Sequence, residues 1–136
     1  MRHLLVLVFL LTLAGCATTE RIPLSQLQTK RMFKLDRTTV LETVRLFALR
    51  EEFRVSSFEE STGRVIGHKK MQTRAGETGK TIVMNLRVND LEPKVTEVDA
   101  RFAYYEHQGE MSKDDESMLV DCYVMLFGIL SDKENG

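Results

Sequence analysis

The sequence lacks a long apolar run, a strong charge of one sign and all but two cysteines. The apolar run at residues 4–13 is about half of the roughly 20 residues that a membrane-spanning helix needs. Nineteen basic residues face twenty acidic ones, which excludes the basic excess typical of general nucleic-acid binders. We therefore expect neither a stable membrane span nor a nucleic-acid partner.

Motifs of enzymes and metal sites are also missing. The chain contains no Gly-x-Ser-x-Gly, no phosphate-binding loop and no Cys-x-x-Cys. His68 and His107 fall on different expected strands, without a second ligand at metal-binding spacing. The acidic run at residues 114–116 lacks the alternating oxygen ligands of a calcium loop. The sequence thus predicts a protein that is not an enzyme and holds no metal.

The start of the chain has the pattern of a secretory signal peptide. Arg2 precedes the short apolar run, and Ala14 and Gly15 are small residues before Cys16. The run Leu13-Ala14-Gly15-Cys16 resembles the lipobox of bacterial lipoproteins. This resemblance implies cleavage between Gly15 and Cys16 and covalent lipid on Cys16. The alternative is an ordinary signal peptide with an incidental cysteine.

The resemblance also implies a location. The residue after Cys16 is Ala17 rather than aspartate, which by the sorting rule of enteric bacteria favours the periplasmic face of the outer membrane. We expect a signal peptide at residues 1–15, a lipidated tether at 16–28 and a single domain at 29–136. With Cys16 lipidated, Cys122 has no disulfide partner, and its apolar neighbours predict a small buried side chain.

Hydrophobic periodicity predicts two helices. Val40, Val44 and Phe47 repeat at helical spacing over residues 39–51, and Thr39 and Glu42 form a capping-box pattern. A second helix, capped by Ser112, is expected at residues 114–131.

Period-two alternation predicts the strands. They are expected at residues 30–35, 53–59, 64–71, 82–88 and 98–105, with a hairpin turn at Gly63 and a polar loop at residues 73–79. The resulting order, β-α-β-β-β-β-α, predicts an α+β fold in which two helices pack on one face of an antiparallel sheet of about five strands.

The second helix is apolar over more than half of its circumference. Its expected core face comprises Met118, Leu119, Cys122, Met125, Leu126, Ile129 and Leu130. A further stripe at Val120, Val124 and Phe127 leaves three alternatives. It is buried within the domain, it is a partner surface, or it lines a small apolar pocket beside the sheet.

A second candidate surface is basic. A hairpin and the loop after it carry Arg64, His68, Lys69, Lys70, Arg74 and Lys80. Such residues could contact anionic lipid headgroups or another envelope polymer. Alternatively, they form a solvated edge that resists strand-to-strand aggregation.

The whole chain resembles small outer-membrane lipoproteins of Gram-negative bacteria. Its domain resembles helix-grip domains, such as those in the C-type lipoprotein of the outer-membrane β-barrel assembly machinery. That resemblance rests on the order of elements, on residues 31–34, on the hairpin at Gly63 and on the apolar run at residues 123–130.

The expectation is a membrane-anchored envelope protein that binds another protein or assists assembly, with no cofactor besides the lipid on Cys16. The alternative is a lipid or small-molecule binder that uses a cleft between helix and sheet.

Overall fold

The computed structural model describes residues 22–71, 79–107 and 109–136. A short 3-10 helix, η2, precedes a sheet of five strands and two long helices. The elements are η2 (Leu24–Gln26), β1 (Lys30–Phe33), α2 (Arg37–Arg50), β2 (Arg54–Glu59), β3 (Arg64–Lys70), β4 (Thr81–Glu92), β5 (Val95–Tyr104) and α3 (Lys113–Asn135).

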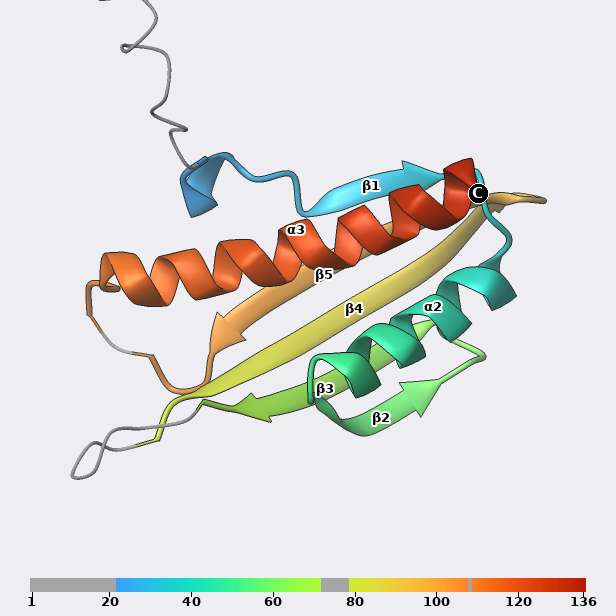
Figure 1. The fold of residues 1–136 in the computed structure, drawn as a ribbon. Coiled ribbons are helices and arrows are strands. Elements are labelled where there is room, and N and C mark those ends of the chain that lie inside the picture. The colour runs from blue at the N-terminus through green and yellow to red at the C-terminus, as the bar shows by residue number, and fades with distance from the viewer. Residues whose placement is uncertain (1–21, 72–78, 108) are drawn as a thin grey trace, which may run out of the picture.

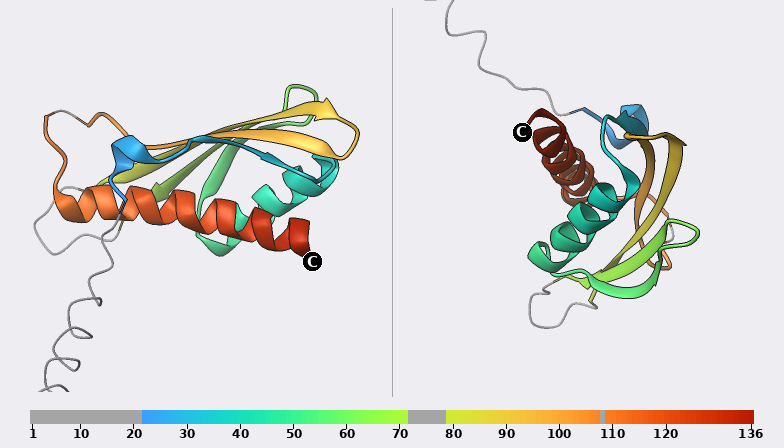
Figure 2. Two further views of the ribbon diagram at one scale, coloured as in Figure 1. Left: turned by 90° about the horizontal axis from the view of Figure 1, so that it is seen from above. Right: turned by 90° about the vertical axis from the view of Figure 1, so that its right-hand side faces the viewer.

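The five strands form one antiparallel sheet in the order β1-β5-β4-β3-β2. Both helices cover one face of this sheet and leave the other face uncovered (Figures 1 and 2). Helix α3 contacts β5, β1 and η2, whereas α2 contacts β2, β4 and β5. The predicted α+β class, the antiparallel sheet and the two helices are confirmed.

Alternation along the two central strands builds the core. Every second residue of β4 and β5 points toward the helices, because successive side chains of a strand point to opposite faces. The predicted inward residues are all buried, namely Ile82, Met84, Leu86, Val88, Val98, Ala100, Phe102 and Tyr104. Strand β4 runs to Glu92, beyond its expected end, and a positive φ of 65° at Lys94 makes the turn into β5.

Helix α2 begins two residues earlier than predicted. Its N-cap is Asp36, whose carboxylate accepts hydrogen bonds from the Thr39 backbone N–H and, at 2.5 Å, from the Thr39 hydroxyl. These bonds lower the pKa of Asp36. The predicted capping box at Thr39 is therefore wrong, because Asp36 offers a better acceptor one helical turn upstream. The predicted cap of α3 is confirmed, since Ser112 accepts from the Asp115 N–H.

Helix α3 is rotated about its axis relative to the predicted core face. Met118 and Met125 were expected inside, but both are exposed. Leu119, Cys122, Leu126 and Leu130 are buried as predicted, and Val120, Tyr123 and Phe127 are buried in addition. The apolar arc is wide enough to allow either orientation, and contacts with the sheet edge select this one.

Part of the predicted tether lies against the domain. We call residues 22–27 the strap. Leu24 and Leu27 pack against the periphery of the core, and the Leu24 N–H donates to the Glu116 carboxylate at 2.9 Å. Residues Leu24 and Leu27, within the expected tether, therefore contact the domain.

Two glycines give opposite predictions for stability. Gly63 adopts φ +72°, and a Cβ there would lie 2.0 Å from the Val88 carbonyl oxygen. Gly63→Ala should therefore lower the free energy of unfolding by about 1 to 3 kcal/mol. Gly128 lies inside α3 with open space around its Cβ position, so Gly128→Ala should raise it by about 0.5 to 1 kcal/mol. Urea unfolding of both variants measures these changes. Equal effects would contradict the different environments assigned to Gly63 and Gly128.

Candidate binding groove beside helix α3

An apolar groove runs between the strap and helix α3. It has a volume of about 410 Å³. One wall is formed by Val124 and Gly128 of α3, and the other by Ile22 and Leu27 of the strap. Its lining is completed by Gln26, Gln28, Arg31, Tyr123 and Phe127. The groove is thus open to solvent and mostly apolar.

Packed aromatic rings form the floor of the groove. The ring centroid of Phe127 lies 6.0 Å from that of Phe33 and 6.4 Å from that of Tyr123. The Arg31 guanidinium lies 5.4 Å from the centroids of both Phe33 and Phe127. A cation over two aromatic faces stabilises this arrangement. Arg31 also brings a positive charge to an otherwise apolar groove.

Tyr123 fixes how α3 sits on the sheet. Its hydroxyl accepts a hydrogen bond from the buried Phe102 N–H at 2.9 Å. Its ring meets that of Phe102 edge-on at 4.9 Å, a favourable aromatic geometry. Burial is the main cause of the raised pKa of Tyr123. The hydroxyl is therefore protonated at neutral pH. It lies beside β5, at the Phe102 N–H, rather than in solvent.

The three residues predicted as a partner stripe have different environments. Val124 is 59% exposed in the groove. Phe127 is 5% exposed and belongs to the core, whereas Val120 is 8% exposed but stands apart from the continuous core. Val120 instead lines a second hollow of about 280 Å³, open to solvent, with Ile22 and Pro23 of the strap. Only Val124 offers a side chain to a partner without rearrangement.

The predicted basic surface is divided between the two faces of the sheet. Arg64, His68 and Lys70 alternate onto the uncovered face, but Lys69 points toward the helices, with its ammonium 5.7 Å from the Phe53 ring. The Lys80 ammonium forms an ion pair with Asp115 of α3 at 2.5 Å. Arg74 lies outside the described residues. Lys69 and Lys80 therefore lie apart from the three residues on the uncovered face: strand alternation turns Lys69 toward the helices, and the ion pair with Asp115 holds Lys80 beside α3.

The uncovered face instead carries charges from several strands. Arg64 lies opposite Arg87, and Arg87 lies opposite Asp99. Asn85, Arg87, Asp99 and Arg101 line a shallow depression of about 290 Å³. Sequence reasoning missed Arg87 and Arg101 as neighbours of the hairpin, although the polar phase of each strand was the available signal. The mixture of signs is typical of cross-strand charge pairing on a solvated sheet.

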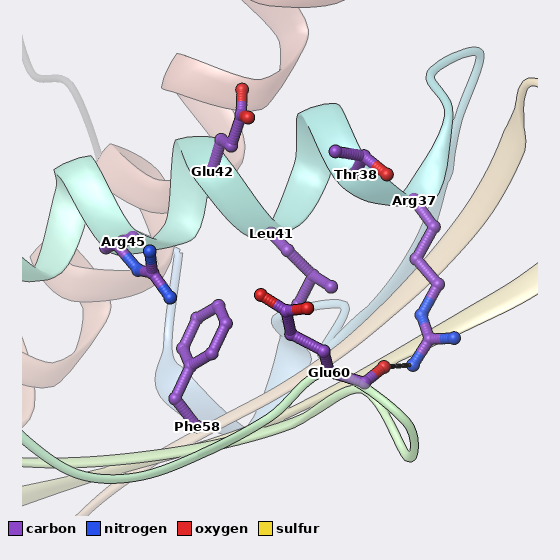
Figure 3. A pocket seen from close by; sticks show the side chains of 7 residues that line it. All are labelled: Arg37, Thr38, Leu41, Glu42, Arg45, Phe58 and Glu60. Atoms are coloured by element: carbon purple, nitrogen blue, oxygen red, sulfur yellow. Dashed lines mark hydrogen bonds between the residues drawn. The ribbon is translucent and has the colours of Figure 1, made fainter.

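A third depression lies between α2 and β2 (Figure 3). It measures about 250 Å³. The Arg45 guanidinium lies 4.2 Å from the Phe58 ring centroid, and Arg37 donates to the Glu60 carbonyl. Figure 3 shows Arg45 directed toward Phe58 and Leu41 directed down between helix and strand. These contacts hold α2 against β2, the strand at the edge of the sheet.

Within the described ranges, no three His, Cys, Asp or Glu side chains gather where they could hold a metal ion. His107 is exposed, and its ring Nε2 lies 2.9 Å from the Gly109 carbonyl oxygen. His68 is half-buried on the uncovered face, opposite Arg54 and Val83. The helices of the described part are all too short or too polar to cross a membrane.

Cys122 is buried, as predicted. Burial raises the pKa of its thiol to about 11, so the thiolate is scarce at neutral pH. A thiol in this state is a poor nucleophile, because reactivity resides in the thiolate.

Comparison with known proteins identifies no family. No family model matches the chain, and no curated protein matches it. Among the solved structures that match is a DUF4468 family protein from Bacteroides ovatus ATCC 8483, with 13% sequence identity over 74% of this chain and 77% of that one. With a TM-score of 0.32, this similarity gives no information about function.

The Lys80–Asp115 pair gives a testable pH dependence. Hydrogen bonding to Lys80 is the main cause that lowers the pKa of Asp115 below 3.8. A lowered folded-state pKa contributes stability above 3.8 that is lost as the pH falls through the folded value. Lys80→Met should therefore cost about 0.2 to 1 kcal/mol at neutral pH.

Urea unfolding of wild type and Lys80→Met across this pH range measures the effect. The difference between them should shrink in acid, once Asp115 is protonated. A difference that stays constant at all pH values would contradict the ion-pair assignment. Lys70→Met is the matched control, because Lys70 is an exposed lysine on the uncovered face.

Proposed function

We propose that this protein is a lipid-anchored envelope lipoprotein, attached through Cys16 to the periplasmic face of the outer membrane, that binds another protein without catalysing a reaction. The lipobox-like residues 13–16 support the anchor. The groove beside α3 supports the binding role, because exposed apolar surface of this kind is typical of interaction sites.

The observation that carries the proposal is the combination of Val124 and Gly128 in one wall of the groove. Val124 is exposed although it is apolar, and the Cβ position of Gly128 is open. A glycine inside a helix is unfavourable relative to alanine by roughly 0.5 to 1 kcal/mol. Packing within the described residues does not require it, whereas close approach of a partner would.

Binding of a lipid or small molecule between helix and sheet has less support. The space under α3 is filled by the packed rings of Phe102, Tyr123 and Phe127. The depression beside α2, at about 250 Å³, is smaller than typical ligand pockets of roughly 300 to 1,000 Å³.

The anchor is tested by Cys16→Ser. The variant should lose incorporation of palmitate and leave the outer-membrane fraction, because serine cannot form the thioether. Metabolic labelling with an alkyne palmitate, followed by membrane fractionation, measures both. Cys122→Ser should label like wild type. Labelling that persists in Cys16→Ser would rule out this anchor.

The binding role is tested by Val124→Asp. Charge in the groove should reduce crosslinking of an envelope partner in intact cells by about tenfold or more, since a buried unpaired carboxylate costs at least a few kcal/mol. Leu46→Asp is the matched control, because Leu46 is an apolar residue of α2 with 65% exposure. Thermal unfolding checks that both variants stay folded.

A specific partner lost from Val124→Asp but kept by Leu46→Asp supports the groove as the binding surface. Equal partner recovery from both variants would contradict it, as would loss of folding in Val124→Asp alone, which would make Val124 a core residue.

A further inference from the structure

The strap is held to the domain by few interactions. Among the described residues, its one hydrogen bond to the rest of the domain joins the Leu24 N–H to the Glu116 carboxylate at 2.9 Å. Its other two backbone bonds are internal, from Gln26 to Pro23 and from Leu27 to Leu24. Segments with few external bonds open locally at low free-energy cost.

The strap is also loosely packed. The groove of about 410 Å³ and the second hollow of about 280 Å³ both border it, and Ile22 lines both. Ile22 is itself 57% exposed. Both hollows are open to solvent, so the strap leaves part of the α3 surface uncovered on either side of Ile22.

The buried core is complete without the strap. All buried members of the continuous core lie between Phe33 and Leu130, whereas Leu24 and Leu27 are only partly buried at its periphery. Val120 lies outside this core and beside the strap. Release of the strap would therefore uncover apolar surface on α3 while leaving the sheet and both helices packed.

We propose that α3 carries a peptide-binding site whose resident occupant is the strap, and that a partner segment of the same chemistry displaces it. The strap shows which chemistry meets this surface: Ile22 lines the groove with Val124 and the second hollow with Val120, and the Leu24 N–H donates to Glu116. This inference rests on the proposed function, because it takes the groove as the partner surface.

Competition between strap and partner follows from their geometry. A segment on the same chain is present at an effective concentration that a free segment matches only at about millimolar levels. The apparent affinity of a partner is therefore its intrinsic affinity multiplied by the fraction of time that the strap is released. A partner must bind α3 more extensively than the strap does, for example by also contacting Gly128.

The experiment uses the full chain with Cys16→Ser and a fluorescent peptide of residues 22–28, Ile-Pro-Leu-Ser-Gln-Leu-Gln, which contains the strap. Leu24→Asp together with Leu27→Asp weakens the strap. We expect this double variant to bind the peptide at least about tenfold tighter than the chain with an intact strap. Adding Val124→Asp should abolish the gain. Equal binding with and without the strap substitutions, or no binding to the double variant, would overturn the proposal.

Hydrogen exchange gives a second readout that needs no ligand. Glu116→Ala removes the acceptor of the Leu24 N–H, so exchange of the Leu24 and Leu27 amides should accelerate by about fivefold, as expected for one hydrogen bond. Amides in the middle of α3 should be unaffected. Leu49→Asp, at an exposed site on α2, is the control. Unchanged strap exchange in Glu116→Ala would also overturn the proposal.

The displacement of the strap and the proposed function are tested by different measurements, so either can be refuted without the other. Peptide binding and amide exchange in purified protein decide the strap, whereas crosslinking in cells decides the partner. A partner that is lost with Val124→Asp, in a chain whose strap substitutions have no effect, would leave the proposed function standing and remove the displacement by the strap.

Discussion

The hydrogen bond from the Phe102 N–H to the Tyr123 hydroxyl decides how the helical layer sits. Strand β1 pairs with β5 only over residues 96–99. At Phe102, β5 therefore has no neighbouring strand on the side where β1 lies. A buried N–H without an acceptor is costly. The Tyr123 hydroxyl satisfies it from α3. This contact rotates Phe127 into the core, turns Val124 outward and so creates one wall of the groove.

Most of the architecture could be predicted from local pattern. Period-two alternation in β4 and β5 identified every inward residue of the two central strands except Thr96, which lies before the expected start of β5, because only one face of the sheet is covered. The cap at Ser112 was equally clear. The start of α2 was less so, because Asp36 and Thr39 are both good N-cap residues. Which of the two caps the helix depends on the path of the chain after β1. Thr96 helps to fix that path, because its hydroxyl donates to the Leu35 carbonyl.

The site could be predicted only in part. Helical periodicity placed Val120, Val124 and Phe127 on one stripe, but it could not say which of them a neighbouring segment covers. That depends on the strap, whose short sequence has no regular period. Similarly, the basic residues that are adjacent in the sequence of β3 do not share one face of the sheet. Strand alternation points Lys69 toward the face that the helices cover. Side-chain direction on a strand was available from the sequence, whereas the rotation of α3 required the tertiary contact at Tyr123.

The strap and β1 lie in series along the chain, which has a mechanical consequence. Tension on the chain before Ile22 reaches the strap first, where a single hydrogen bond to Glu116 resists it. The next resistance is β1, whose ladder with β5 is antiparallel and only four residue pairs long. The strap can therefore act as a compliant element that yields under load before the sheet does.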